Sequence, residues 1–212
     1  MAPGFHRGKG DRHGRRVPAS HPVPRPRSIL VLRNRQQTRG VELRLLRRMA
    51  RALLRELWPN GGFDLAIYLV GAPEMIRLNE GFLRHRGSTD VITFDYTDKA
   101  GQASRLSPPT ASGTGPGDRR DACPTLLHGE IFVCVDEAVR QARRFKTTWQ
   151  SELVRYIVHG VLHLLGYEDD SPRARRQMKT AEDALVRRLA GHPVADTRFS
   201  KQMLRGSSTW LP

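Results

Sequence analysis

Two histidines followed by an acidic cluster are the residues of this 212-residue chain best suited to chemistry. His159 and His163 are four residues apart, and side chains at this spacing share one face of a helix, roughly 6 Å apart along its axis. Two imidazoles placed in this way can bind one metal ion. Asp169 comes six residues after His163, within reach of the same ion if the chain turns back. Glu168 and Asp170 compete for the third place, but we expect their side chains to project in other directions.

The residues around the histidines favour a metal site. Residues 153–165 are apolar nearly all round, so they predict a buried central helix, in which two imidazoles need polar partners. Gly166 predicts a left-handed helix end, which lets the chain reverse and brings Asp169 towards both rings. Three protein ligands and an open fourth position are typical of a catalytic zinc site. The sequence therefore predicts one bound Zn²⁺, with other divalent metals as alternatives, held by His159, His163 and Asp169.

The hydrophobic pattern predicts the elements that must position these ligands. Apolar and β-branched runs predict strands at 29–32, 63–70, 90–96 and 130–134, and helical periodicity predicts helices at 41–57, 73–84, 135–145, 147–165 and 172–189. The run Thr147-Thr-Trp-Gln150 has the form of a capping box and predicts where the central helix begins. This order of elements implies a single α+β domain, in which a small mixed sheet of about four strands packs against about five helices.

Composition predicts three segments outside the packed core. Residues 1–27 are basic and rich in Pro and Gly, so we expect a disordered N-terminal extension. Residues 97–125 are rich in Gly, Pro and Ser, and we expect them to form an insertion that protrudes between two strands. Residues 191–212 are expected to form a flexible tail. The folded domain is thus predicted to span residues 28–190.

The charge of the chain indicates a polyanionic partner. Its formal net charge is +15, and phosphate neutralisation drives such chains onto nucleic acid without reading sequence. The alternative is that these cations only solvate the surface. Two cysteines without a CxxC motif are typical of the reducing cytoplasm, and no apolar run is long enough to span a bilayer. We therefore expect a cytoplasmic protein that binds nucleic acid and does not act at a membrane.

Several motifs together resemble one known family. The run from His159 to Tyr167, His-Gly-Val-Leu-His-Leu-Leu-Gly-Tyr, followed by acidic residues, is similar to the signature of the YbeY endoribonucleases, the rRNA maturation factors. Leu78-Asn79 with Thr89-Asp-Val-Ile-Thr-Phe94 resembles a second block of that family, and Gly129-Glu-Ile131 resembles a third. The resemblance covers roughly residues 28–190 and leaves both ends and residues 97–125 unmatched.

The resemblance implies a metal-dependent endoribonuclease specific for single-stranded RNA. Its implied roles are rRNA maturation, at the 3′ end of the small-subunit rRNA, and ribosome quality control, so the implied partners are rRNA and the ribosome or its small subunit, with no DNA expected. The chain departs from the family at two positions: Asp169 replaces the usual third histidine, and Leu83 stands where an arginine usually faces the RNA phosphate. Arg84 or Arg86 could supply that charge. Glu130 is a candidate general base.

Two other functions remain open from sequence. Zinc metalloproteases of the HExxHxxGxxH type share the ligand spacing, and aspartate can replace their last histidine. They require a glutamate directly after the first histidine as general base, whereas this chain has Gly160 there. The third possibility is a non-catalytic, ribosome-associated RNA-binding module whose metal is structural. The open fourth coordination position disfavours that reading.

Overall fold

The computed structural model describes residues 27–59, 61–97 and 126–193. The predicted N-terminal extension, the body of the predicted insertion and most of the predicted tail therefore lie outside the described residues. Within the described ranges, no helix combines the length and the apolar composition that a bilayer crossing requires.

Four strands form one mixed sheet with the order β1-β2-β4-β3. Their bounds are Ile29–Asn34 for β1, Phe63–Val70 for β2, Val91–Asp95 for β3 and Leu127–Cys134 for β4. Strands β1, β2 and β4 are parallel, and β3 pairs with β4 in the antiparallel direction at one edge of the sheet. The edge position of β3 brings residues near the middle of the chain beside the central helix.

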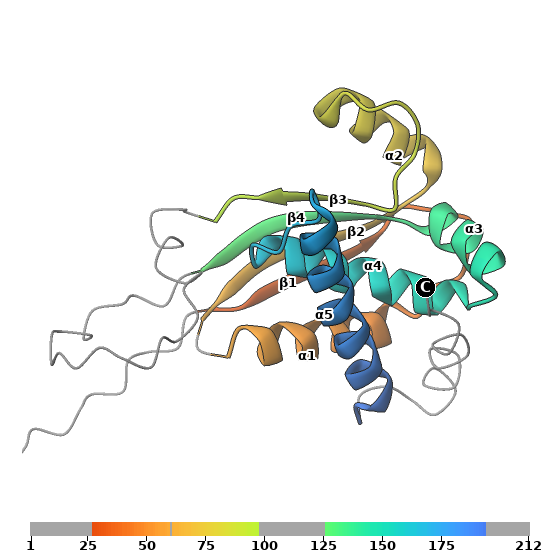
Figure 1. Cartoon of the computed structure of the whole chain (residues 1–212). Helices are drawn as coiled ribbons and strands as arrows, with labels where there is room; N and C mark the ends of the chain where they lie inside the picture. The colour runs from red at the N-terminus through yellow and green to blue at the C-terminus, as the bar shows by residue number, and fades with distance from the viewer. Residues whose placement is uncertain (1–26, 60, 98–125, 194–212) are drawn as a thin grey trace, which may run out of the picture.

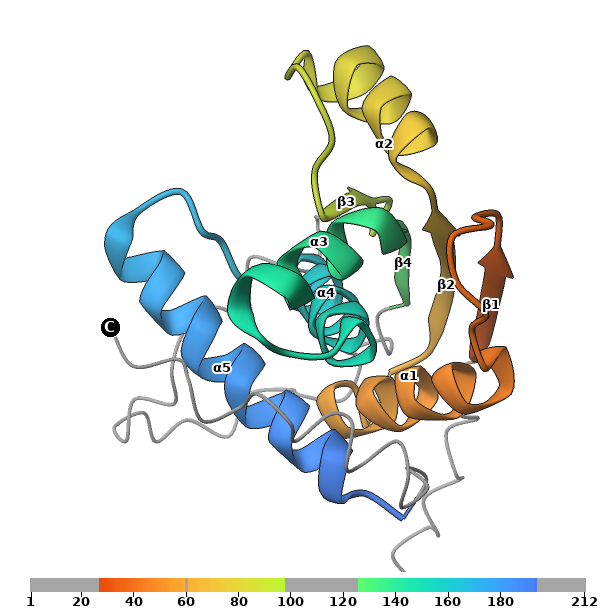
Figure 2. The ribbon, with the colours of Figure 1, turned by 90° about the vertical axis from the view of Figure 1, so that its right-hand side faces the viewer.

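The helices cover the two faces of the sheet unequally (Figures 1 and 2). Their bounds are Leu43–Leu57 for α1, Ala72–Leu78 for α2, Val135–Phe145 for α3, Trp149–Leu164 for α4 and Pro172–Gly191 for α5. Helices α1 and α4 lie under one face, with α5 outside them, whereas α2 stands over one end of the other face. These elements confirm the predicted α+β fold with a buried central helix.

Most of the core lies between the sheet and the helices α1 and α4. Along β2 the residues alternate between buried and half-buried, as expected when only one face of a strand is fully covered. The buried face of α1 repeats at helical spacing and meets the inward side chains of β1 and β2. The main cluster includes Leu32, Met49, Leu53, Leu54, Leu65, Ile67, Ile131, Val158, Val161, Leu162 and Leu185.

The helix predicted over residues 73–84 is broken in the structure. Helix α2 ends at Leu78, and a π-helical turn, η1, follows over Asn79–Leu83 before Arg84 adopts a left-handed conformation with φ of 57°. The buried side chain of Asn79 donates a hydrogen bond to the carbonyl of Gly87 at 2.9 Å. This contact pulls the following loop back over the helix end, so a regular helix cannot continue through Arg84.

The central helix begins one residue later than the capping-box pattern predicted. Thr148 is the N-cap, and its hydroxyl accepts a hydrogen bond from the backbone N–H of Ser151 at 3.2 Å. Thr147 instead donates a hydrogen bond from its hydroxyl to the buried carboxylate of Glu152. Two adjacent threonines can each fill either role, so tertiary packing of Glu152 decides between them.

Close packing of α4 on β3 and β4 depends on Gly129. A Cβ atom at this position would lie 2.5 Å from the backbone oxygen of Phe94 and 2.8 Å from Cδ2 of Leu164. Neither neighbour can move freely, because one is backbone in the adjacent strand and the other is a fully buried side chain. Gly129 therefore sets how near the last turn of α4 approaches the sheet.

We predict that Gly129→Ala lowers the free energy of unfolding by about 1–3 kcal/mol through overpacking. Thermal unfolding followed by circular dichroism measures the change. Gly81→Ala is the matched control, because a Cβ there meets nothing within 4 Å and the position lies in a helical turn, where alanine is as good or better. An equal loss of stability in both variants would contradict the packing argument.

Candidate metal centre

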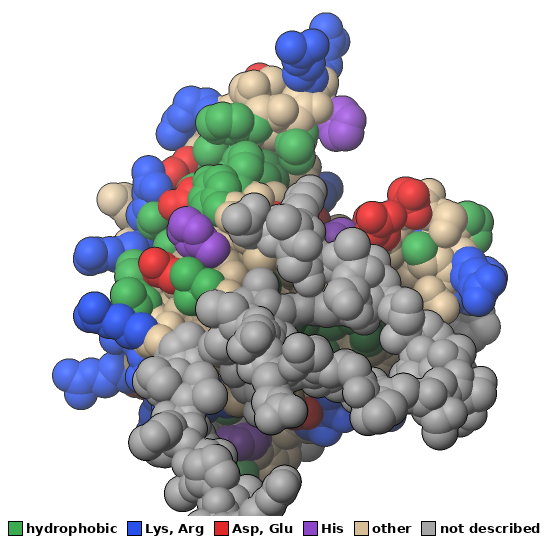
Figure 3. Space-filling model, turned by 90° about the vertical axis from the view of Figure 1, so that its left-hand side faces the viewer, with side chains coloured by type: hydrophobic (Ala, Val, Ile, Leu, Met, Phe, Trp, Pro, Cys, Tyr) green, Lys and Arg blue, Asp and Glu red, His purple; other side chains and the backbone are tan. Residues whose placement is uncertain are grey.

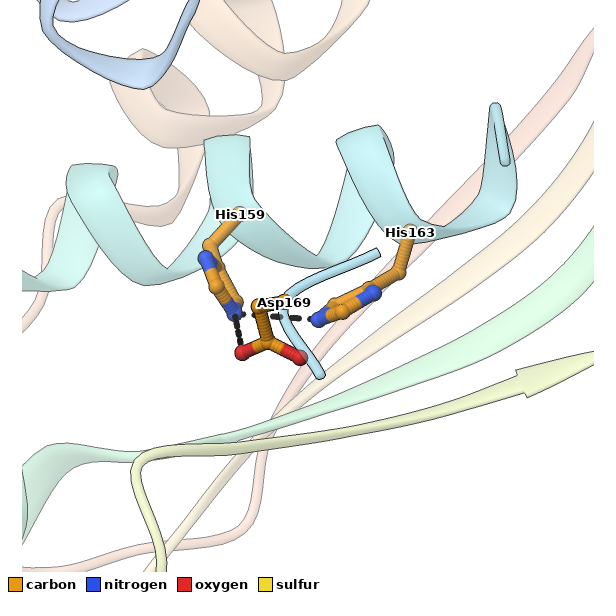
Figure 4. A group of neighbouring side chains, drawn as sticks. All are labelled: His159, His163 and Asp169. Atoms are coloured by element: carbon orange, nitrogen blue, oxygen red, sulfur yellow. Dashed lines mark hydrogen bonds and ion pairs between the residues drawn. The ribbon is translucent and has the colours of Figure 1, made fainter. Parts of the chain in front are cut away.

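Three side chains from two segments converge at one point beside the sheet (Figure 4). His159 and His163 project from the same side of α4, and Asp169 approaches from the loop after the helix. The Nε2 atoms of the two rings are 3.0 Å apart, and Nε2 of His159 is 3.9 Å from Oδ2 of Asp169. One donor atom from each residue lies within 4.8 Å of the other two. The chain reversal inferred from Gly166 therefore brings these residues together.

The donor spacing fits a small divalent cation. Bonds of 2.0–2.2 Å to zinc place two ligand atoms of a tetrahedral site roughly 3.3 Å apart, a value between the two separations seen here. Asp169 is half exposed, so one side of the group is open to solvent. Glu168 and Asp170 are outside the group, which leaves Asp169 as the carboxylate donor among these three neighbours.

The end of α4 orients His163. Gly166 has φ of 86°, and the N–H groups of Gly166 and Tyr167 bond to the carbonyls of His163 and Leu162 at 2.9 and 3.0 Å. This is a Schellman motif, and it confirms the predicted left-handed helix end. The motif places the carbonyl of Tyr167 2.9 Å from Nδ1 of His163. An Nδ1–H that donates to this carbonyl leaves Nε2 with its lone pair towards the other donors.

A carboxylate on α5 orients His159 in the same sense. Nδ1 of His159 lies 3.2 Å from Oε2 of Glu182, a buried residue on the facing helix. The other oxygen of Glu182 forms an ion pair with Arg155, which also reaches Oδ1 of Asp183 at 2.5 Å. Such carboxylate–histidine contacts hold metal-ligating rings in one tautomer. Sequence reasoning required a partner for His159 but did not find Glu182, because 23 residues separate the two.

The two rings differ in how readily they hold a proton. Burial favours neutral His159, but the hydrogen bond and charge of Glu182 outweigh burial and raise the pKa of His159 above its ordinary value. Burial and the neighbouring His159 lower the pKa of His163. His159 therefore holds an added proton more readily than His163 does. A metal ion would displace it, since both ligands must be deprotonated to bind.

Helix α5 also holds the loop that carries Asp169. The Arg175 side chain donates from Nε to the carbonyl of Asp169 at 2.8 Å and from Nη2 to that of Asp170 at 3.4 Å. Ser171 caps α5, since its hydroxyl accepts from the N–H of Ala174 at 3.2 Å. The loop backbone is therefore tied to α5 at both of these residues. This leaves the carboxylate of Asp169 available to the two rings.

Gly160 faces the sheet and has no room for a larger side chain. A Cβ atom there would lie 2.6 Å from Cγ2 of Ile131 and 3.3 Å from Oγ1 of Thr93. The glutamate that a metalloprotease of the HExxHxxGxxH type places at this position would therefore overlap β4. The packing around Gly160 is therefore a second argument, besides the residue type, that the chain is not a metalloprotease of this type.

The two residues proposed from sequence for catalysis lie elsewhere. Ile131 and Gly129 face α4, so Glu130 between them points to the opposite face of the sheet. Its carboxylate accepts hydrogen bonds from the hydroxyls of Tyr68 and Tyr96, each at 3.2 Å. The structure does not bring Glu130 to the histidines. Arg84 lies at the end of η1, where its side chain is exposed.

Comparison with known proteins decides the family. The family model described as endoribonuclease YbeY matches residues 31–190, which include all three donors. The chain belongs to the endoribonuclease YbeY family. Members of this family from Chlorobium phaeovibrioides and Acidothermus cellulolyticus are 33% and 34% identical, over 74% and 72% of this chain and 88% and 89% of their own lengths.

Two further comparisons, with one sequence relative and one solved structure, differ in what they support. The endoribonuclease YbeY of Chlorobium luteolum is 32% identical over 59% of this chain and 74% of its own length. A Thermotoga maritima protein with a known solution structure is 22% identical and has a TM-score of 0.45, over 80% of this chain and 97% of its own. That structural similarity is too low to bear on function, so the assignment depends on the sequence relatives.

We predict that Glu182→Gln weakens the binding of a divalent cation by about 10–100-fold, the usual effect of removing a carboxylate behind a ligating histidine. Zinc titration of the purified protein against a chromophoric chelator measures the change. Asp183→Asn is the matched control, because it removes a carboxylate from Arg155 but none from His159. Equal zinc affinity in wild type and Glu182→Gln would show that Glu182 does not support the site.

Proposed function

We propose that this chain is a metal-dependent endoribonuclease that cuts single-stranded RNA during maturation of ribosomal RNA. The substrate we propose is the 3′ region of the small-subunit rRNA, with a further role in ribosome quality control. The observation that carries the proposal is the convergence of two imidazoles and one carboxylate in a member of the endoribonuclease YbeY family. The formal net charge of +15 is consistent with an RNA substrate.

His159, His163 and Asp169 are the residues proposed to hold the ion, and zinc is the ion proposed. Two nitrogen donors favour zinc among common divalent cations, whereas the carboxylate also suits harder ions. A divalent cation bound there supplies Lewis acidity and a water of lowered pKa for phosphodiester hydrolysis. Glu182 and the carbonyl of Tyr167 keep both rings oriented, so no ring has to rotate during the reaction.

Contact with the RNA phosphate is proposed for Arg84, with Arg86 as the neighbouring alternative. Both side chains are exposed on the segment that follows η1, next to Leu83, where the family usually has arginine. A cation here would attract an RNA phosphate and help to hold the strand on the protein. Glu130 is a poor candidate for the general base, because its carboxylate faces away from α4.

The ribosome or its small subunit is proposed as the partner, because rRNA is the proposed substrate. The cytoplasm is proposed as the compartment. In support, Cys134 is a buried free cysteine, whereas Cys123 lies outside the described residues. Burial raises the pKa of the Cys134 thiol, which keeps it protonated and unreactive.

We predict that the purified protein binds about one equivalent of a divalent metal, as expected for a single mononuclear site. Elemental analysis should find this metal in the wild type and in Asp170→Ala, but at a much lower level in Asp169→Ala. The two variants remove neighbouring carboxylates of the same loop, and only Asp169 faces the rings. Full metal content in Asp169→Ala would remove this residue from the ligand set and leave two histidines.

We also predict that cleavage of a labelled single-stranded RNA stops when a chelator is added and returns when zinc is restored. The double variant His159→Ala with His163→Ala should be inactive, because it removes both nitrogen donors of the proposed site. Asp170→Ala serves as the active control on the same segment. Activity that survives in the double variant would show that another part of the chain cuts RNA.

A further inference from the structure

The sheet face opposite α4 carries a continuous row of aromatic rings. Phe82 on η1 packs edge-on against Phe94 on β3 with ring centres 5.2 Å apart, and Phe94 packs edge-on against Phe132 on β4 at 5.8 Å. Phe132 stacks on Tyr68 of β2 at 4.7 Å, and the guanidinium of Arg35 lies 5.4 Å from the centre of the Tyr68 ring. The row thus crosses β3, β4 and β2 in order.

The end of this row at Phe82 is open to solvent, and so is the neighbouring ring of Tyr96. Phe82 is 66% exposed, and Tyr96, whose ring packs edge-on against His128 at 5.4 Å, is 51% exposed. In the space-filling view, hydrophobic side chains gather on the part of the surface over α2 and β3, with basic side chains at its upper and outer borders (Figure 3). Contiguous apolar patches on a protein surface often mark binding sites, whereas single exposed apolar side chains are ordinary. We call Phe82, Phe94, Tyr96 and Tyr68 the aromatic face.

The charges around the aromatic face suit a polyanion. Arg33 pairs in register with Tyr68, and both Arg33 and Arg35 act on the Tyr68 hydroxyl electrostatically. Exposed cations continue past η1 at Arg84 and Arg86. The carboxylates on this side include Asp64 on β2, Glu130 on β4, Glu74 on α2 and Glu80 on η1. Glu130 accepts hydrogen bonds from two tyrosines and Glu74 pairs with Arg35 at 2.8 Å, so these two carboxylates already have partners within the protein.

Among the described residues, the aromatic face and the metal centre lie on opposite faces of the sheet, on either side of the edge strand β3. β3 is the edge strand, and its successive residues point to opposite faces. Oγ1 of Thr93 approaches Gly160, the residue next to His159, whereas Phe94 belongs to the aromatic face. An RNA strand that passes over β3 would therefore reach from the aromatic face to the metal centre within the width of one β-strand.

We propose that the aromatic face binds single-stranded RNA by stacking its bases on Phe82 and Tyr96 while the flanking arginines contact its phosphates. Proteins usually bind unpaired bases with exposed aromatic rings that lie beside cations, since every base has a flat face that can stack on a ring. This inference rests on the proposed function and adds to it a binding surface for the part of the RNA that lies away from the cleaved bond. It also supplies a reason for single-strand preference, because paired bases cannot reach the rings.

The test measures binding of a fluorescently labelled 12-nucleotide single-stranded RNA to the full chain, with chelator present to prevent cleavage. We expect Phe82→Ala and Tyr96→Ala each to weaken binding about fivefold or more, the lower end of the range for one base–ring stack. Tyr96→Phe and Phe82→Tyr keep a ring and should bind as wild type does. Inorganic polyphosphate, which has charge but no bases, should bind equally to all of these proteins.

The assignment is overturned if the alanine variants keep wild-type RNA affinity. It is also overturned if they lose polyphosphate affinity to the same degree, or if their RNA binding weakens no more than that of the ring-keeping variants. An alanine variant with unchanged RNA affinity and a lowered midpoint of thermal unfolding would show that the ring packs within the fold and does not bind RNA. A wild type without affinity for RNA would overturn both this assignment and the proposed function.

Cleavage assays on the same RNA separate the two proposals. If the wild type cuts RNA with zinc but the alanine variants bind RNA normally, the proposal of an RNA-binding aromatic face is wrong. The endoribonuclease proposal is then still supported. If ring removal weakens RNA binding but the wild type cuts no RNA under any metal condition, the nuclease proposal fails and the face stands as an RNA-binding surface.

Discussion

The close approach of α4 to β3 and β4 is the constraint on which the rest of the structure depends. Two glycines permit it, one on each side of the contact: Gly160 on the helix and Gly129 on the strand. With side chains at these positions the helix would have to move away from the sheet. Because His159 precedes Gly160 directly, that movement would also shift the ring relative to the loop that carries Asp169. The packing of the core and the geometry of the donors are therefore set by the same contact.

Burying two imidazoles in an apolar helix has a cost that polar partners must offset. The fold meets it with one partner for each ring: the carbonyl of Tyr167 for His163 and the carboxylate of Glu182 for His159. Glu182 is in turn buried, and the Arg155 guanidinium pairs with its carboxylate. Helix α5 thus does more than cover α4, because it fixes the tautomer that a metal ligand needs.

The two faces of the sheet have different surroundings. The face under α1 and α4 forms the core and supports the donor group, and most of its inward residues are aliphatic or glycine, with Phe63 and Thr93 as exceptions. The other face is covered by α2 at one end and carries tyrosines, phenylalanines and arginines. Edge strand β3 separates them and contributes Thr93 to one and Phe94 to the other.

The sequence by itself determined the elements that depend on local pattern. The strands, the amphipathic α1, the apolar α4 and the left-handed end at Gly166 all follow from hydrophobic period and residue type over short spans. The two histidines at helical spacing follow as well. Boundaries were less accurate where two choices were locally equal, as at Thr147 and Thr148, or where a side chain such as Asn79 bonds across a loop.

Only the tertiary structure decided the contacts between distant segments. Glu182 behind His159, Arg175 under the Asp169 loop and the outward direction of Glu130 each depend on how helices and strands pack. The row of rings on the sheet combines residues from three strands and η1, which no spacing in the sequence relates. Local pattern depends on neighbours along the chain, whereas these contacts depend on register and helix placement, which the whole core sets at once.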